Sequence, residues 1–580
     1  MMRVRSWWQA SVMLAGFIGC LSRPGGAAEL QNPPDMRRDA DGRFELTARQ
    51  GTYTITGGGA PIRVDTRSFA QTADGPLVGP TLRIRGGDTL KLHLRNELTY
   101  DPAQGDAFMS DTLPHGFDVL NVHYHGLHVT PVSPGDNVLL NVYPKDTTDE
   151  ELAACKHEVH DDAEHRHVCF AGDYDYSFEL PGDHTAGTYW YHPHKHGAVA
   201  MHLASGLAGA LIIEDPAHGL DSLAAVKAAA EKVVVINEIM YRDPGTTGGV
   251  NVVDCLGVYG FMSACRYDPP LPPPPPDPPA ANVKLSVNGQ FNPTITLRTG
   301  EAQVWRVLNA AVGNVVPFCL VPMPGTAAPA PSLFVLGVDG IPVQRPASVD
   351  GAADLPIALK APVYDLSGAA AASDAVTNEI GLLAPGQRLD LMVQGAAQPG
   401  YYVLLQPDPS AQQQPTMDQL CATPTQALID GAAWDRQVVM YVDVVAPGTG
   451  DAYNKDVPTQ AQLNALRRPT PLADAEDRPP APTQGVVFGF SSQTFSPATN
   501  GASTVNGRPF NLQRTQRFLK LDQMDLWSVQ SASDAHMFHI HINPFQVFQR
   551  GNVAFAFPVW RDTALVNCNS ATSGCSFPAA

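Results

Sequence analysis

The sequence is poor in charge and, after its first thirty residues, in long apolar runs. Charged residues make up 16% of its 580 residues, and the formal net charge is -19. Nucleic acid and anionic membrane surfaces would repel such a chain, so we exclude both as partners. A membrane span needs roughly 20 consecutive apolar residues. No later segment reaches that length, so we expect no transmembrane span.

The N-terminus carries one short apolar stretch. A basic start precedes an apolar run over about residues 12–21, and small residues follow up to Ala28. This pattern is typical of an export signal, here over residues 1–28. The run FIGC also resembles a bacterial lipoprotein box, which makes Cys20 the alternative lipid anchor. We therefore expect a periplasmic or secreted protein.

Cysteine is scarce, with 9 residues in the chain. Export implies an oxidising compartment, so these residues are candidates for disulfides. Sequence alone does not fix their connectivity, and proximity is the guide. The predicted pairs are Cys155 with Cys169, Cys255 with Cys265, Cys568 with Cys575 and, by remainder, Cys319 with Cys421.

Helical periodicity is also scarce, and residues 220–232 are the best helix candidate. Gly (50) and Pro (52) are abundant instead. Short alternating runs such as GTYTITG and GALIIED read as strands bounded by turns. The class is therefore all-β, with sandwich-like domains.

The strand-like runs repeat along the chain. PTLRIRGGDTLKLHLRN in the first unit and PTITLRTGEAQVWRVLN in the second share one design of Pro-Thr, strand, Gly turn, strand and Asn. Such self-similarity indicates an internal domain repeat. We predict a first domain over 45–215, a second over 230–445, a linker over 446–485 and a partial third domain over 486–580. A polyproline segment, 269–279, reads as a surface loop of the second domain.

Histidine is concentrated where the strands end in turns. Three short segments, HYHG, YWYHPHKHG and HMFHIH, hold eight of the 18 His residues. Those residues are His123, His125, His192, His194, His196, His536, His539 and His541. A single His-x-His in a strand is more often incidental than a ligand pair, but three such pairs in repeated β domains predict a metal site.

The type of ligand narrows the choice of metal. Positions i and i+2 of a strand point to the same face, so each His-x-His pair presents two ring nitrogens to one side. Neutral imidazole suits Cu, Zn, Fe and Ni. A zinc enzyme more often combines His with a carboxylate or Cys in a set of three or four ligands. So many paired histidines favour a cluster of several copper ions.

With the motifs VNGQFNPTITLRTGE and VWRDT, these segments make the chain resemble the three-domain bacterial laccase-like multicopper oxidases. The resemblance spans roughly residues 45–580. It implies three cupredoxin-like Greek-key β-sandwich domains, the third incomplete. It also implies a blue (type 1) copper that takes electrons from a small reducing substrate, phenolic, aromatic or a metal ion. A trinuclear cluster between the first and third domains would reduce O₂ to water.

The resemblance assigns a role to each matching histidine. His123 and His539 would hold the type 2 copper, His125, His192, His194 and His541 would contribute to the type 3 pair, and His536 would be a type 1 ligand. His128 and His196 lie outside the ligand pattern. Asp136 stands near the place of an acid that assists proton delivery to reduced oxygen, and a surface-turn Asp is the alternative interpretation.

The departures from the family pattern concern the end of the third domain. Met537 stands where the family usually has Pro, which is a mild change. The family's last motif, His-Cys-His with a further His and Met or Leu, has no match after Phe545, and no His follows His541. A blue site needs two His and one Cys. The chain as printed therefore lacks the type 1 Cys and two of the six type 3 ligands.

Three hypotheses follow. The first is an exported copper oxidase whose sequence here is a fragment, inactive alone. The second is a non-catalytic copper-binding protein of the envelope. The third is a split oxidase completed by another chain.

The insertion 155–169, rich in His and acids, is a solvated loop or an auxiliary metal site.

Overall fold

The structure is a computed structural model, and it describes residues 27–566 with interruptions. The interruptions are 58–60, 73–74, 102–114, 159–168, 243–249, 254–281, 347–348, 350–353, 362–371, 408–419, 432–433, 470–480, 491–502, 510–516, 521–522, 533–535 and 552. Cys20, the polyproline segment and the predicted pairs Cys255–Cys265 and Cys568–Cys575 lie outside the described residues. The other two predicted disulfides, Cys155–Cys169 and Cys319–Cys421, are present and confirm those pairings.

One sheet of 11 strands runs through the first and second predicted domains, in the order β19-β18-β21-β15-β11-β12-β2-β1-β4-β8, with β13 paired to β11. Its strands are β1 (Phe44–Ile55), β2 (Ile62–Ser68), β4 (Thr89–Glu97), β8 (Asp173–Glu179), β11 (Glu231–Arg242), β12 (Val250–Val253), β13 (Asn282–Val287), β15 (Ala302–Asn309), β18 (Ser332–Val338), β19 (Ile341–Pro342) and β21 (Arg388–Gln394). The two halves join where β12 pairs in parallel with β2. Backbone hydrogen bonds therefore connect the two repeats.

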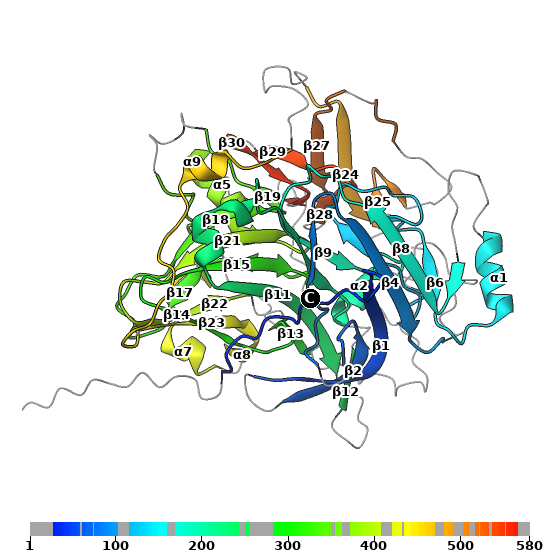
Figure 1. Ribbon diagram of the computed structural model, residues 1–580, viewed down its shortest axis with the longest axis horizontal. Coiled ribbons are helices and arrows are strands. Elements are labelled where there is room, and N and C mark those ends of the chain that lie inside the picture. Colours follow the sequence, from blue (N-terminus) through cyan, green and yellow to red (C-terminus); the bar gives the residue numbers. More distant parts are fainter. Residues whose placement is uncertain are drawn as a thin grey trace, which may run out of the picture.

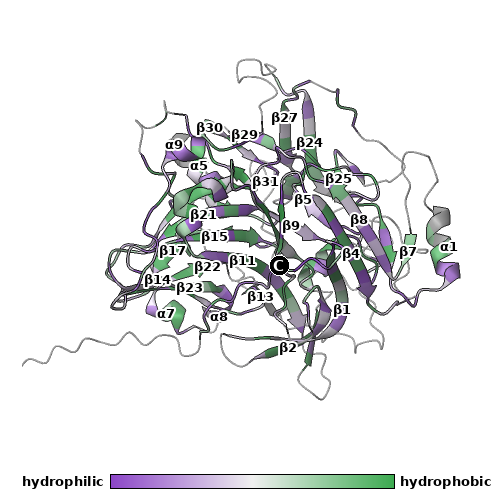
Figure 2. Ribbon diagram, viewed as in Figure 1, coloured by the Kyte–Doolittle hydropathy of each residue, from purple (hydrophilic) through white to green (hydrophobic). Residues whose placement is uncertain are grey.

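A second sheet faces the N-terminal half of the large one. It contains β3 (Leu82–Arg85), β10 (Gly209–Glu214), β9 (Gly187–His192) and β5 (His123–His125). Leu90, Leu92 and Leu94 of β4 are buried while their neighbours are exposed or half-buried, so apolar and polar colours alternate along this strand (Figure 2). Such alternation is expected for a strand with one face on a core. Strands β5 and β9 are buried on both faces, and they carry the histidines.

The second repeat has the same two-sheet construction. Strands β14 (Thr294–Arg298), β23 (Val438–Val445), β22 (Gly400–Leu405) and β17 (Leu320–Pro322) form its second sheet. The fully buried Trp305 lies in the core between the sheets. The repeated sequence design forms β3 and β4 in the first repeat and β14 and β15 in the second, as predicted.

The third region is built of smaller sheets and lies above the other two in the view of Figure 1. Strands β24 (Gln484–Phe490), β25 (Ser503–Val505), β26 (Arg508–Pro509) and β27 (Trp527–Ser531) form one sheet, while β28 (His536–His539) pairs with β31 (Thr563–Val566) and β29 (Phe545–Arg550) pairs with β30 (Val553–Arg561). Phe555, Phe557 and Val559 of β30 belong to the core of the second repeat. The third region is thus attached through that core.

Helices are short, so the predicted all-β class is confirmed. They are α1 (Asp149–Glu158), α2 (Val199–Ala204), η3 (Leu220–Ser222), α3 (Ala224–Ala228), α5 (Ala372–Gly381), α7 (Gln426–Ile429), α8 (Trp434–Gln437) and α9 (Gln460–Asn464) among the described residues. The short strands β6 (Asn141–Tyr143), β7 (Cys169–Ala171), β16 (Val316–Pro317) and β20 (Leu382–Leu383) complete the described elements. The helix expected over 220–232 is limited to the single turns η3 and α3, because Glu231 already pairs with Val304 as the start of β11. None of the described helices is long and apolar enough to cross a membrane.

The predicted linker is anchored along part of its length. Helix α9 buries Leu463 against the second repeat, and its N-terminus is closed by a capping box at Thr459. Beyond it, Arg467 Nη1 forms an ion pair with Asp215 Oδ2 at 3.0 Å, at the end of the first repeat. The segment therefore touches both repeats.

Candidate metal centre

Strands β5 and β9 place the first histidines side by side. The strands are antiparallel neighbours, with His123 opposite His192 and His125 opposite Trp190. Beyond the end of β9, the backbone N–H of His194 donates to Asn121 Oδ1 at 2.5 Å. The Asn121 amide in turn donates to two backbone carbonyls, which fixes its direction.

The third region supplies two further rings. His541 stacks on His123 with a centroid separation of 4.3 Å, and His539 stacks on His125 at 3.9 Å. The metal-binding atoms of His123, His125 and His539 all lie within 4.8 Å of one another. Residues from distant parts of the sequence therefore meet at one site. His125 and Asp562, which are 437 residues apart in the sequence, are also in contact there.

Each of the six predicted cluster histidines has its ring next to at least three of the others. His194 lies 5.1 Å from both His123 and His541, and His192 lies 5.3 Å from His123 between ring centroids. The argument from one strand face applies only to His123 and His125, because β9 ends at His192 and β28 ends at His539. The other two pairs meet through the turns that follow these strands.

Hydrogen bonds orient several rings from behind. Nδ1 of His123 contacts Asp136 Oδ2 at 2.8 Å, Nδ1 of His192 contacts the Pro193 carbonyl at 2.9 Å, and Nδ1 of His539 contacts the Asp562 carbonyl at 2.7 Å. The Nε2 atoms of these three rings are buried without a hydrogen-bond partner among the described residues. Buried polar atoms are normally paired. A metal bound at these nitrogens would satisfy them, so the donor set fits copper.

Burial keeps these rings neutral. Desolvation, reinforced by neighbouring imidazoles, lowers the pKa of His123 and His192 well below the usual value. The same causes lower the pKa of His194 to about 4. A neutral imidazole retains the lone pair that a metal needs. The cluster is therefore ready to act as a ligand set at neutral pH.

Asp136 is a buried residue of the site, which overturns the surface-turn interpretation. Only 7% of its surface is exposed, and besides His123 it accepts a hydrogen bond from the backbone N–H of Tyr124 at 3.0 Å. Burial raises the pKa of its carboxyl group to about 8. The contact with Nδ1 makes Asp136 an orienting partner of His123.

His536 stands apart from the six rings by its position at the opposite end of β28. It pairs with Val566 in the strand ladder, and its ring lies 5.0 Å from that of Phe488. A blue site would need a thiolate nearby. The four cysteines among the described residues are all joined in disulfides, so that part of the chain offers no thiol.

His128 and His196, which were predicted to lie outside the ligand pattern, have neighbours of their own. The backbone N–H of His128 donates to His184 Nε2 at 3.1 Å, which fits a structural role outside the ligand set. His196 has its ring 6.1 Å from that of His115.

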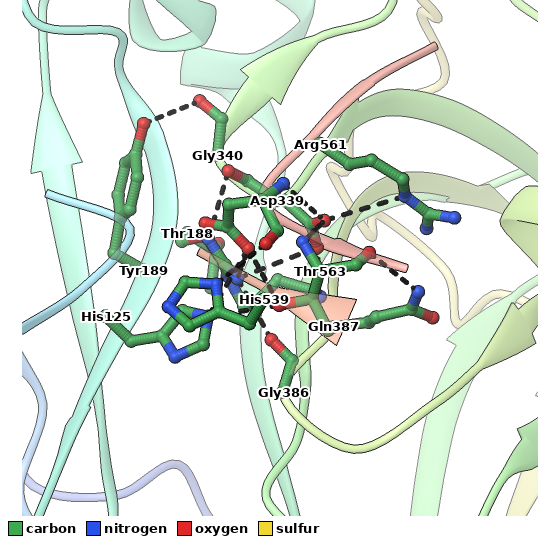
Figure 3. Close-up of polar contacts among 12 residues, drawn as sticks. His125, Thr188, Tyr189, Asp339, Gly340, Gly386, Gln387, His539, Arg561 and Thr563 are labelled. Atoms are coloured by element: carbon green, nitrogen blue, oxygen red, sulfur yellow. Dashed lines mark hydrogen bonds and ion pairs between the residues drawn. The ribbon is translucent and has the colours of Figure 1, made fainter. Parts of the chain in front are cut away.

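Sequence reasoning missed a charged group that touches the cluster. Asp562 and Thr563 contact His125 Nε2 at 3.3 and 3.1 Å. Arg388 and Asp339, from the second repeat, form hydrogen bonds with Asp562. Figure 3 shows Asp339 beside Thr563. Asp562 belongs to the motif VWRDT. The sequence feature that could have pointed to it is the charged Arg-Asp pair directly after an apolar run.

Two parts of the chain match models of known families. Residues 159–218 match one family model described as multicopper oxidase, and residues 479–573 match a second with the same description. The first segment contains His192 and His194, and the second contains His539 and His541. Strand β5, with the other two cluster histidines, lies outside both matches.

Solved structures of bacterial multicopper oxidases share the fold. One is a laccase-like multi-copper oxidase, CueO, from the lignin-degrading bacterium Ochrobactrum sp., with 18% identity and a TM-score of 0.54, covering 93% of this chain and 91% of that one. Another is McoA from the hyperthermophile Aquifex aeolicus, with 18% identity, a TM-score of 0.55 and coverages of 93% and 90%. A third is a metallo-oxidase from Campylobacter jejuni, with 15% identity, a TM-score of 0.52 and coverages of 94% and 88%.

The domain matches and the shared fold agree with the histidine motifs. They confirm that the chain resembles the three-domain bacterial laccase-like multicopper oxidases, an all-β family that binds copper.

Proposed function

We propose that the protein is a copper-dependent oxidase that couples one-electron oxidation of a small reductant to the reduction of O₂ to water. The observation that carries this proposal is the convergence of six neutral imidazoles from two distant parts of the chain. A purely structural cluster would leave several buried ring nitrogens unsatisfied, at a cost of about 1–3 kcal/mol each. Metal binding removes that cost.

The histidines divide the work in the proposal. His123 and His539 hold a type 2 copper, and His125, His192, His194 and His541 contribute to a type 3 pair. His536 is offered as a type 1 ligand. Bound copper supplies the one-electron chemistry and the reduction of O₂. The protein's own part is to hold the rings neutral and oriented, with Asp136 as the acid nearest to the cluster.

The proposed reductants are phenolic or aromatic compounds, or metal ions. The relative from Ochrobactrum sp. is described as active towards lignin model compounds and lignosulfonate, and that from Campylobacter jejuni as a metallo-oxidase. Both descriptions support a reductant of one of these classes. Export to the periplasm or beyond is part of the proposal, since the two disulfides suit an oxidising compartment.

A second candidate function is copper binding without electron transfer. It is favoured by the absence of a thiol among the described residues, because a blue copper needs a thiolate. A split oxidase, in which another chain supplies the thiolate, is consistent with the same observation. All three proposals share the histidine cluster, so copper content and colour separate them.

The test is a copper count, an absorption spectrum and an O₂-uptake assay on one purified sample. A complete oxidase binds four copper ions, shows a strong blue thiolate band and consumes O₂ with a methoxyphenol as reductant. A copper binder shows fewer ions, no blue band and no O₂ uptake. Protein that binds no copper would overturn the proposal. His218→Ala serves as the control, because that ring is exposed and lies outside the cluster.

A further inference from the structure

Asp562 lies between β30 and β31, with its carboxylate against the back of His125. Its Oδ1 atom is 3.3 Å from His125 Nε2. The Thr563 hydroxyl lies 3.1 Å from the same ring nitrogen and donates its own proton to Asp562 Oδ1 at 3.0 Å. Figure 3 shows His125 and His539 next to Thr563. Both groups at His125 Nε2 are thus oxygen atoms positioned to accept.

A buried guanidinium holds this carboxylate on its other side. Arg388 Nη1 and Nη2 donate to Asp562 Oδ1 and Oδ2 at 2.7 and 2.6 Å, in a two-pronged ion pair. The Arg388 side chain is fully buried, and that of Asp562 is 4% exposed. A paired fork of this kind fixes the plane of the carboxylate as well as its position.

The remaining N–H groups of Arg388 are also hydrogen-bonded, which fixes its orientation. Nε donates to the Thr188 carbonyl at 3.2 Å, Nη1 to the Gly386 carbonyl at 2.9 Å and Nη2 to the Asp339 carbonyl at 3.0 Å. A guanidinium has five N–H donors. With the two bonds to Asp562, all of them are used, so the guanidinium has one orientation.

Asp339 stabilises the same arrangement by accepting hydrogen bonds from backbone N–H groups. Its Oδ1 accepts from the Arg388 N–H at 2.9 Å, while its Oδ2 accepts from the N–H groups of Asp562 and Thr563 at 3.2 and 3.3 Å. Arg388 and Asp339 both come from the second repeat, which supplies none of the six cluster histidines. The second repeat therefore contacts the cluster only through these charged groups and their neighbours among the described residues.

This arrangement decides which nitrogen of His125 carries the proton. An ionised carboxylate can only accept hydrogen bonds, and the Thr563 proton is already directed at Asp562. His125 Nε2 must therefore be the donor, which leaves the lone pair on Nδ1. The arrangement is opposite to that of His123, His192 and His539, whose Nδ1 atoms are engaged and whose Nε2 atoms have no partner among the described residues.

We propose that Asp562 and Arg388 are positioning residues that hold His125 with its proton on Nε2, so that Nδ1 is the atom His125 offers to a metal. The second repeat thereby controls the metal centre without contributing a histidine to it. This inference rests on the proposed function for its metal, but its statement about the ring proton concerns the metal-free protein as well.

The first test compares two buried carboxylates, each paired with an arginine. Asp562→Asn replaces an acceptor by a group that also donates, and it should weaken Cu²⁺ binding about 10- to 100-fold, as loss of a partner behind a metal-binding histidine typically does. Asp118→Asn is the matched control, because Asp118 pairs with Arg67 at 2.8 Å and its side chain is only 7% exposed. Cu²⁺ affinity is measured by competition with a chelator, and unfolding by urea is measured on the same samples.

The expected result is a loss of Cu²⁺ affinity in Asp562→Asn that Asp118→Asn does not share, even where both variants lose stability. Equal Cu²⁺ affinity in Asp562→Asn and the wild-type protein would overturn the inference. An equal loss in both variants would also overturn it, because the effect would then follow from general destabilisation.

The second test needs no folded variant at position 562. Nitrogen-15 NMR of the metal-free wild-type protein reports the protonated nitrogen of each histidine, and the His125 signals are those missing from His125→Gln. A proton on Nε2 is expected, and a proton on Nδ1 would overturn the inference. Wild-type protein that binds no Cu²⁺ would overturn the proposed function, and the NMR result would then decide the role of Asp562 and Arg388 by itself.

Discussion

The six histidines fall into two groups that are held in different ways. The first group, His123, His125, His192 and His194, belongs to strands β5 and β9 and the turn after β9, and every residue of both strands is buried. The second group, His539 and His541, follows from β28, all of whose residues are only half-buried in a two-stranded sheet with β31. The first group is supported by an extensive hydrophobic core, whereas the second has fewer apolar contacts, among them Met537 of β28 and Leu565 of β31.

Polar contacts compensate for the smaller core of the second group. His539 Nδ1 contacts the Asp562 carbonyl, and Asp339 of the second repeat accepts hydrogen bonds from the backbone of Asp562 and Thr563. Apolar burial is tolerant of small shifts, whereas a buried charged network is strongly stabilising only when every partner is present. The second group should therefore depend on a few residues, and the first on many.

Gly126→Ala should have the largest effect on stability and copper binding, because it changes the site where the two groups of histidines meet. Gly126 has φ +86, and a Cβ there would lie 2.3 Å from Asp562 Oδ2 and 2.8 Å from Arg388 Nη2. Disrupting a buried ion pair costs about 3–5 kcal/mol. We expect a loss of that size in the free energy of urea unfolding, together with loss of bound copper.

Gly300→Ala is the control for this change. Its φ is +70, and nothing lies within 4 Å of a Cβ built there. Only the backbone cost of a positive φ should remain, on the order of 1 kcal/mol. Equal destabilisation by the two substitutions would show that the contact with Asp562 and Arg388 is unimportant.

Removing one ring from each group should lower copper binding in both cases but reduce the free energy of unfolding by different amounts. His192 is 5% exposed and stacks on Trp190 with a centroid separation of 4.0 Å. His192→Ala should cost about 2–4 kcal/mol of unfolding free energy, since it leaves a cavity in a packed site. His539→Ala should cost only about 1 kcal/mol. Both variants should bind less copper, and equal losses of stability would contradict the comparison.

Asp136→Asn should affect metal binding more than folding. An asparagine can keep the bond from Tyr124 N–H while turning its NH₂ group towards His123 Nδ1. The ring must then carry its proton on Nε2, where the metal would bind. We expect copper affinity to fall about 10- to 100-fold. The measurement is a chelator competition, and an unchanged affinity would mean that Asp136 does not orient His123.

The last expected effect is on the pH dependence of stability in the metal-free protein. The pKa of His194 is lowered to about 4, so the unfolded chain binds the proton first as the pH falls below about 6.5. Stability is therefore complete above that pH and declines between about pH 6.5 and pH 4, by at most about 1.4 kcal/mol per pH unit for one ring.

Two variants locate the source of this slope. His194→Gln should reduce it, as measured by urea midpoints at pH 7, 6 and 5. Burial lowers the pKa of His541 to about 3, but the residue is exposed and solvent screens its charge, so His541→Gln should reduce the slope less. A larger reduction from His541→Gln would reverse the comparison between the groups.

The sequence was informative where the chemistry is local. The His-x-His spacing, the repeated strand design and the disulfide Cys155–Cys169 could be predicted from neighbouring residues, whereas Cys319–Cys421 joins residues 102 apart and was predicted only as the remaining pair. Asp136 could be singled out only through the family resemblance, which places an acid shortly after the first histidine pair. Its burial was not predictable, since the turn reads as polar.

The charged network behind His125 could not be predicted in the same way. Arg388 and Asp562 are 174 residues apart, and Asp339 and Asp562 are 223 apart. Acids and arginines are mostly exposed in proteins, so nothing in their local sequence marks them as buried partners. The turns after β9 and β28 were likewise missed, because the strand-face argument assumed that each strand continues through its second histidine.

The anchored linker has a consequence for how the two histidine groups meet. Leu463 is buried in the second repeat and Arg467 is paired with Asp215, so the chain leading to the third region is fixed at a point close to both repeats. Association of the second group with the first is then an intramolecular step, governed by an effective concentration and not by the amount of protein in solution. Dilution should leave the assembled centre unchanged, whereas a centre shared between separate chains would come apart.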